Sequence, residues 1–374
     1  MRRIQLIIKV TNGCNLRCKY CYNAAKEFKH EVISLDKVDK MFALVADFDR
    51  VDVIFHGGEP MLASREFYTQ VLELQKKTSV QTGVTFSNQI QTNATLIDSQ
   101  WLDFFKANKI AVGVSFDGIY NDAYRGKTRD TLNAIELLKK NKMQFGCIAV
   151  VADKDYDVAK NYEYMKSFGV NVDFSYVFIE GNAKSIDVLP VESYVQQMVD
   201  LFDRWIYDRE GTPVRNFNYI LNKIFHCGSE YCCNGSCIGN FFCLDANGDI
   251  FGCSRESMHK YCFGNVADVH SMSEILNSKG FKELIIGAIT RRKSCAEKCE
   301  LFDYCKGGCS DDAITNGDIS KQNPKYCFFF KTLFNHIKAK VDEIFEQKVD
   351  LSTLNPYFRK ALVQATSLPE EDSI

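Results

Sequence analysis

In the first half of the chain, short apolar runs alternate with segments whose apolar residues recur at helical spacing. Short runs rich in Val, Ile and Phe are typical of strands buried between helices. They predict six strands, over residues 5–10, 52–55, 84–91, 110–115, 145–151 and 173–178. Apolar residues recur at helical spacing between these runs, which predicts helices over residues 36–46, 65–77, 98–108, 131–141 and 157–168. Alternating strands and helices predict an α/β fold with a parallel sheet and right-handed crossovers.

Polar or glycine-rich motifs follow four of the predicted strands. The motif TNGCNLRCKYC follows the first strand, HGGEP the second, QTN the third and SFDG the fourth. Chemistry gathers at the C-terminal ends of the strands of parallel sheets. We therefore expect the four motifs to lie around one mouth of the sheet.

Composition and charge exclude several classes of protein. The chain has 374 residues, with 46 Lys+Arg against 48 Asp+Glu, so its net charge of −2 provides no basic surface for nucleic acid. No apolar run approaches the roughly 20 residues that span a membrane, and the first residues lack the features of an export signal. We therefore predict a cytoplasmic protein without a membrane partner. In that compartment, clustered thiols hold metal more often than they form disulfides.

The 16 cysteines are distributed unevenly. Three lie near the N-terminus and twelve lie between residues 227 and 327. This change of composition predicts a domain boundary near residues 210–235, and we divide the chain into a barrel with linker helices (1–225), a cysteine-rich domain (226–330) and a C-terminal helix and tail (331–374). Apolar residues at helical spacing place that helix over 328–347.

Cys14, Cys18 and Cys21 form a C-x3-C-x2-C loop. Three thiolates this close can hold three irons of a [4Fe–4S] cluster and leave the fourth iron open to a substrate or cofactor. The residues alone also allow a zinc site completed by a distant ligand, or three unrelated thiols. The glycines of HGGEP allow backbone to approach a ligand closely, and Glu59 offers an acceptor for an ammonium group, although the motif alone could be a tight turn.

Together, the three-cysteine loop with Tyr20, the GGEP motif and the serine after the fourth strand resemble the radical S-adenosylmethionine (SAM) enzymes. The resemblance covers residues 4 to about 180 and implies a partial (β/α)6 TIM-like barrel. It implies that SAM chelates the open iron through its amino and carboxylate groups. Reductive cleavage of SAM would then give a 5′-deoxyadenosyl radical that abstracts a hydrogen atom from substrate. The implied SAM contacts are Tyr20, Gly57, Gly58, Glu59, Asn93, Ser115 and Arg125.

Eight of the twelve cysteines in the second half of the chain form two spaced groups, residues 237–253 and 295–327, with Asn247-Gly248 as a turn signal between two apolar runs. This turn predicts a β-hairpin near Cys243 and Cys253, and residues 295–309 are predicted as a short ligand-bearing loop. Eight thiols can close two [4Fe–4S] clusters, although zinc ribbons have similar spacings.

The pattern resembles the SPASM domain of radical SAM enzymes that modify peptides and proteins, in the version found in anaerobic sulfatase maturases. The resemblance implies two auxiliary clusters, which makes three clusters in all. The implied ligands are Cys237, Cys243, Cys253 and Cys309 for an inner cluster, and Cys295, Cys299, Cys305 and Cys327 for an outer one. Three residues separate Cys295 from Cys299 where two are usual.

This chain departs from the sulfatase maturases at two positions that bear on the reaction. Sulfatase maturases carry an Asp after the third SPASM cysteine, where this chain has Ser254, and a Tyr two residues past the last cysteine of the first loop, where it has Asn23. We therefore predict oxidative cross-linking of a ribosomally made peptide, through a thioether or carbon–carbon bond, with formylglycine formation by a sulfatase maturase as the alternative. A redox or zinc-binding module without catalysis is a third hypothesis. No residue is assigned as catalytic.

The resemblance also implies partners: a peptide or protein substrate, a reductant such as flavodoxin or ferredoxin, and, unless the barrel and SPASM surfaces recognise the substrate themselves, a separate peptide-recognition protein. Five cysteines are left without a cluster. Cys147 lies in an apolar strand and is predicted to pack in the core. Cys227, Cys232 and Cys233 could bind a substrate thiol, act as cluster ligands or line a loop, and Cys262 has no assignment.

Overall fold

A curved parallel sheet forms the first half of the molecule. The structure, a computed structural model, describes residues 2–23, 31–226 and 237–366. The six parallel strands are β1 (Arg3–Thr11), β2 (Arg50–Gly57), β3 (Thr85–Thr92), β4 (Ile110–Ser115), β5 (Phe145–Val151) and β6 (Asn171–Tyr176). Each overlaps one predicted strand, so the α/β fold with a parallel sheet is confirmed. Cys147 is buried in β5, as predicted.

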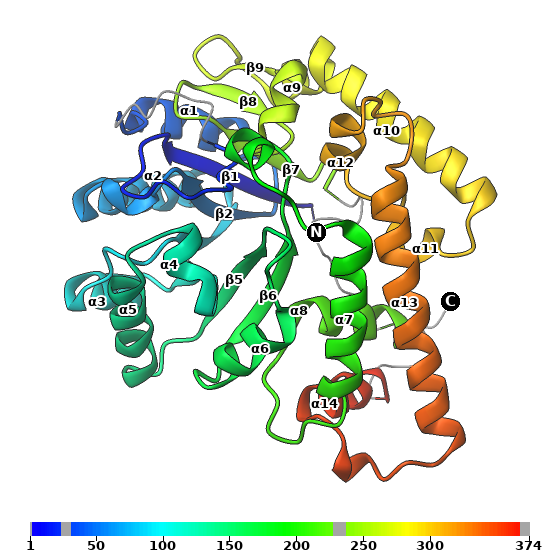
Figure 1. The fold of residues 1–374 in the computed structure, drawn as a ribbon. Helices are drawn as coiled ribbons and strands as arrows, with labels where there is room; N and C mark the ends of the chain where they lie inside the picture. The colour runs from blue at the N-terminus through cyan, green and yellow to red at the C-terminus, as the bar shows by residue number, and fades with distance from the viewer. Residues whose placement is uncertain (1, 24–30, 227–236, 367–374) are drawn as a thin grey trace.

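Helices pack around the outer side of this sheet (Figure 1). Those of the first half are α1 (Leu35–Leu44), α2 (Arg65–Thr82), α3 (Ser99–Ala107), α4 (Asn121–Tyr124), α5 (Thr128–Lys140) and α6 (Val158–Lys166), followed by α7 (Val191–Trp205) and α8 (Arg215–Ile224). Short 3-10 turns occupy Pro60–Leu62, Gly118–Tyr120 and Gly181–Ser185. Ser34 and Ser64 cap α1 and α2 by accepting from backbone N–H groups of the first turn.

The sheet continues into the second half of the chain. Its strand order is β6-β5-β4-β3-β2-β1-β7-β8-β9, in which β7 (Phe241–Leu244) pairs in parallel with β1. Strands β8 (Asp249–Phe251) and β9 (Gly264–Asn265) follow in antiparallel order. The predicted hairpin is confirmed, and Gly248 takes the left-handed φ of +101° that its tight turn requires. The sheet thus places Cys243, a predicted inner-cluster ligand, in the strand beside β1.

The remaining elements are helical. They are α9 (Met272–Asn277), α10 (Lys279–Lys298), α11 (Phe302–Cys305), α12 (Ser310–Thr315), α13 (Pro324–Glu346) and α14 (Pro356–Thr366), with 3-10 turns at Glu256–Tyr261 and Leu351–Thr353. Helix α13 matches the predicted C-terminal helix and packs against α7 and α8. His336 Nε2 lies 2.7 Å from Asp203 Oδ1 across the contact with α7. In the part of the chain that the structure describes, none of the helices is both long and apolar enough to cross a membrane.

One local prediction is wrong. Residues 295–309 are not a loop throughout, because α10 extends through Lys298 and α11 contains Cys305. Cys227, Cys232 and Cys233 and the end of the tail lie outside the described residues.

Candidate active site

The three-cysteine loop follows β1 and is held by the segment after β6. The Asn182 N–H donates to the carbonyl of Cys21 at 3.0 Å, and its side chain donates to the carbonyl of Cys18 at 3.1 Å. Gly181 has a φ of +51°, and a Cβ there would lie 2.4 Å from the Cys21 carbonyl oxygen. Only a residue without a side chain fits between these two loops.

Charge and burial mark the three thiols as a ligand set. Burial raises the pKa of each thiol, and that of Cys18 rises to about 11. The thiols also repel one another as anions, while the Arg125 guanidinium lowers the pKa of Cys18 and Cys21. Three thiols that resist ionisation individually need a cation to become thiolates together, and metal binding releases their protons. This donor set fits three irons of one cluster.

At the two glycines of the GGEP motif, the end of β2 lies in close contact with the cysteine loop. A Cβ at Gly57, whose φ is +124°, would lie 2.3 Å from the Thr11 carbonyl oxygen. A Cβ at Gly58 would lie 2.1 Å from the carbonyl oxygen of Gly13. The N–H of Gly58 donates to the Thr11 carbonyl and the N–H of Glu59 to that of Gly13, both at 2.8 Å. The glycines are therefore needed for contact between two loops, in addition to any contact with a ligand.

Glu59 ties the ends of β2 and β3 together. Its carboxylate is buried and accepts from the Met61 N–H at 3.0 Å, the Thr92 hydroxyl at 2.7 Å and the Asn93 N–H at 2.8 Å. A carboxylate can accept about four hydrogen bonds, so one position is left for an ammonium group. The Asn93 side chain donates to Asn15 Oδ1 on the cysteine loop at 2.8 Å.

Tyr20 and Arg125 form one wall of the site with Asp117, which the sequence interpretation missed. The Arg125 Nε lies 2.9 Å from Asp117 Oδ2, and its guanidinium carbon is 5.2 Å from the centre of the Tyr20 ring. The Tyr20 hydroxyl donates to the same carboxylate, which also accepts from the Val150 N–H at 2.9 Å. Ser115 accepts from the Gln91 side chain at 2.9 Å. Asp117 is in the quoted SFDG motif, but its contacts come from distant parts of the chain.

Asp117→Asn is expected to destabilise the fold by about 3 kcal/mol, because it leaves the guanidinium of Arg125 buried without its counter-ion. Urea unfolding of the purified variant measures this loss. As a control, Asp187→Asn removes an exposed partner of Lys154 and is expected to leave the unfolding midpoint unchanged. Equal midpoints for the two variants would contradict the role of Asp117.

The four predicted inner-cluster cysteines lie around the hairpin and at the start of α12: Cys237 precedes β7, Cys243 lies in β7, Cys253 follows β8 and Cys309 precedes α12. Cys237, Cys243 and Cys309 are buried and Cys253 is half-buried. Arg255 Nη1 lies 4.0 Å from Cys309 Sγ, and the nearby thiolate of Cys253 also favours its charge. The hydroxyl of Tyr22, next to Cys21, hydrogen-bonds with Ser254, next to Cys253. This bond joins the three-cysteine loop to the predicted inner site.

The four predicted outer-cluster cysteines line one cavity of about 100 Å³. Cys295 and Cys299 are one helical turn apart at the end of α10, where the Cys299 N–H donates to the Cys295 carbonyl at 2.9 Å. Because three residues separate them, the two cysteines are four positions apart, which puts both on one face of a helix. The unusual gap between them is therefore compatible with the helical end of α10. Burial and mutual repulsion raise the pKa of Cys327 to about 11. The donor set fits a fully ligated cluster.

A buried ion pair between the two halves of the sheet was also missed. Lys9 in β1 is 1% exposed, and its Nζ lies 3.3 Å from Asp245 Oδ2 on the hairpin. Burial works to lower the pKa of Lys9, but Cys243 and Asp245 outweigh it and raise the pKa. Burial and the nearby Lys9 lower the pKa of His56 to about 4, so this imidazole is neutral. In the sequence, Lys9 only interrupts an apolar run.

Comparisons with known proteins agree with this arrangement. The Radical SAM superfamily matches residues 8–179, and the SPASM iron–sulfur cluster-binding domain matches residues 232–310. A cysteine-type anaerobic sulfatase-maturating enzyme from Clostridium perfringens is 30% identical over 370 residues, covering 90% of this chain and 96% of the relative.

Solved structures give the same result. The structure of anSMEcpe with bound AdoMet has a TM-score of 0.79 and 28% identity, covering 97% of this chain and 98% of that one. A second structure, with AdoMet and the Kp18Cys peptide, has a TM-score of 0.78 and 29% identity, over 92% and 99% of the two chains.

The fold and the cysteine sets define an iron–sulfur enzyme built on a partial barrel. The chain belongs to the radical SAM superfamily and carries a SPASM domain. The predicted family, enzyme class and cofactors, SAM and catalytic and auxiliary [4Fe–4S] clusters, are confirmed. The relatives favour the alternative of sulfatase maturation over the cross-linking predicted first. The individual ligand and SAM-contact residues and the domain boundaries remain predictions.

Proposed function

We propose that this enzyme oxidises a cysteine or serine side chain of a peptide or protein substrate, as sulfatase-maturating enzymes do. The observation that carries the proposal is similarity along nearly the whole chain to a cysteine-type sulfatase-maturating enzyme. A peptide complex among the similar structures supports a peptide substrate. A reductant such as flavodoxin or ferredoxin would supply electrons, and a cytoplasmic location remains part of the proposal.

Each group of residues has a task in this proposal. Cys14, Cys18 and Cys21 would hold the catalytic cluster, and SAM bound there supplies a radical that removes a hydrogen atom from substrate. Glu59 is buried and the Arg125 side chain is only 10% exposed, so both would help to exclude water from the reacting groups. The eight SPASM cysteines would hold the clusters that accept the electron left on substrate.

A specific observation favours a second candidate, oxidative cross-linking of a peptide. Formylglycine formation from a thiol or hydroxyl needs a proton acceptor, and Ser254 stands where sulfatase maturases carry an Asp. Its partner Tyr22 has a pKa raised to about 12 by burial, so the pair is neutral at physiological pH. A neutral pair is a poor proton acceptor.

A product assay separates the two candidates. The protein, reconstituted with iron and sulfide without oxygen, is incubated with SAM, reduced flavodoxin and matched peptides that carry Cys, Ser or Ala at one position. We expect an aldehyde on the Cys or Ser peptide, detected by reaction with a hydrazide and mass spectrometry. A product that has lost hydrogen but carries no aldehyde would favour cross-linking. Unchanged peptides together with SAM cleavage would contradict both candidates for these substrates.

A further inference from the structure

One arginine of the SPASM domain is completely buried. Arg291 lies on α10, one helical turn before Cys295, and is 0% exposed. Arginine stays protonated in proteins, so this side chain carries a full positive charge. Because burying an isolated charge is costly, buried charges are normally paired with an opposite charge. The surroundings of Arg291 therefore show which anion offsets its charge.

The hydrogen bonds of the Arg291 guanidinium go to neutral groups. Its Nε donates to the Gly307 carbonyl at 2.9 Å, and its Nη2 donates to the Ser310 hydroxyl at 2.9 Å and the Gly308 carbonyl at 3.5 Å. Its Nη1 donates to the Ile319 carbonyl. In the part of the chain that the structure describes, no carboxylate forms an ion pair with this guanidinium.

These hydrogen bonds place the charge between the two predicted cluster sites. The guanidinium is bound to residues 307–310, the segment that connects Cys305 of the outer set with Cys309 of the inner set. Burial lowers the pKa of Arg291, and thiolates from both sets work against this effect, those of Cys309, Cys295 and Cys237. One buried cation therefore interacts with ligands of both predicted clusters.

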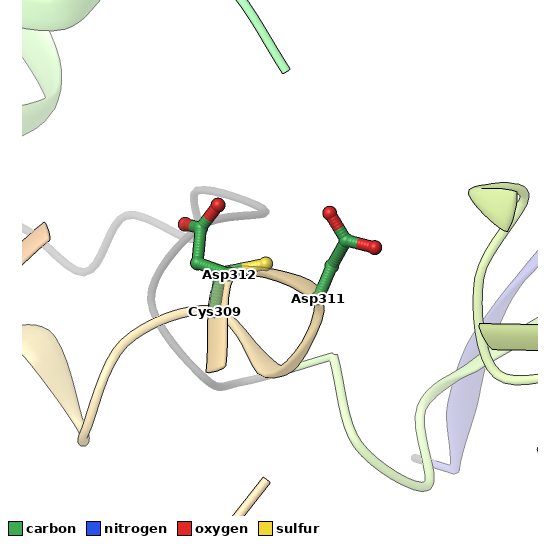
Figure 2. A group of neighbouring side chains, drawn as sticks. All are labelled: Cys309, Asp311 and Asp312. Carbon is green, nitrogen blue, oxygen red and sulfur yellow. The ribbon is translucent and has the colours of Figure 1, made fainter. Parts of the chain in front are cut away.

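The carboxylates near Cys309 are paired with a different cation. Figure 2 shows Asp311 and Asp312 beside Cys309, and the ligand atoms of all three lie within 4.8 Å of one another. Arg255 Nη1 lies 2.5 Å from Asp311 Oδ2 and 4.0 Å from Asp312 Oδ1. Burial raises the pKa of Asp312 to about 6, although Arg255 and, more weakly, Arg291 work to lower it. Arg255 is thus the ion-pair partner of the two acids, which leaves the cluster thiolates to offset the charge of Arg291.

We propose that Arg291 is a positioning residue for electron acceptance, whose buried charge offsets the negative charge of both auxiliary clusters and so raises both reduction potentials. A cluster with four thiolate ligands is an anion, and reduction adds one more negative charge. A buried cation beside both sites stabilises each reduced form, because little solvent screens it. This role rests on the proposed function, in which these clusters accept the electron left on the substrate.

Exposed cations provide a comparison. Lys298 and Lys331 also line the cavity of the outer cysteines, but both are exposed, so solvent and salt screen their charges. Lys293, on the same helix as Arg291, is exposed as well. Removing an exposed charge from this region should therefore have little effect on the clusters, whereas removing the buried charge should affect both.

The test compares Arg291→Gln, which removes the charge but keeps N–H donors, with Arg291→Lys, which keeps the charge. Lys293→Gln is the control. Each protein is reconstituted without oxygen, and its cluster potentials are measured by titration followed by electron paramagnetic resonance; added SAM identifies the signal of the catalytic cluster. At a fixed potential, we expect the ratio of reduced to oxidised form to fall about tenfold for both auxiliary clusters of Arg291→Gln, a shift of about 59 mV for one electron. Arg291→Lys and Lys293→Gln should match the unaltered protein.

Unchanged auxiliary potentials in iron-loaded Arg291→Gln, a shift in one cluster only, or an equal shift in either comparison variant would overturn the inference. If Arg291→Gln does not bind iron, the iron content of Arg291→Lys decides. Full iron in Arg291→Lys supports charge compensation, and iron loss in both variants shows a purely structural role. Aldehyde formation by the unaltered protein is measured separately. Shifted potentials without any aldehyde contradict the proposed function alone, whereas unchanged potentials with aldehyde formation contradict only the role of Arg291.

Discussion

Cys18→Ala is expected to abolish the formation of 5′-deoxyadenosine from SAM. Two thiols cannot hold the catalytic cluster with one open iron, whereas the eight SPASM cysteines are untouched. Iron should fall from about 12 to about eight per chain, because each cluster contains four. The measurements are an iron assay and chromatography of the nucleoside products after anaerobic reconstitution and reduction.

Cys262→Ala is the matched control, since this thiol is exposed and belongs to none of the three predicted sets. It should retain full iron and full activity. Full iron in Cys18→Ala would show that Cys18 is not a ligand, and lost iron in Cys262→Ala would show that the predicted ligand sets are incomplete.

Gly58→Ala is expected to destabilise the protein by about 3 kcal/mol and to prevent SAM binding. The added Cβ would lie 2.1 Å from the Gly13 carbonyl oxygen, so the cysteine loop must move away from β2. That movement breaks the hydrogen bond from the Glu59 N–H to Gly13. Urea unfolding and SAM binding by equilibrium dialysis measure the two effects.

Gly146→Ala serves as the control within β5, because its Cβ would lie 3.6 Å from the nearest atom, at ordinary contact distance. We expect this variant to unfold at or slightly above the original urea concentration. If Gly58→Ala unfolded at the same concentration and still bound SAM, the close contact between the two loops would be unimportant.

The sequence was sufficient for the features that depend on local pattern. The six strands follow from short apolar runs, and the outer-cluster cysteines, grouped only through a family resemblance, line one cavity. The sequence was insufficient for predicting contacts between residues that are far apart in the chain. Lys9 and Asp245 are separated by more than two hundred positions, and nothing near either residue indicates the other. The addition of β7 to β1 and the carboxylates around Arg255 were missed for the same reason.

The prediction for residues 295–309 failed for a different physical reason. Closely spaced cysteines and two glycines are typical of a loop, but α10 packs against the turn at Glu256–Tyr261, and its helix extends to Lys298. Tertiary packing thus overrides local composition there. The two glycines still bend the chain after α11, since Gly307 and Gly308 have φ values of +84° and +72°.

The most direct test of the radical SAM assignment is the yield of 5′-deoxyadenosine from the unaltered protein, reconstituted with iron and sulfide, reduced and supplied with SAM. We expect formation of 5′-deoxyadenosine and methionine in equal amounts, dependent on the reductant. Tightly bound zinc in place of iron, with SAM recovered intact, would contradict the account.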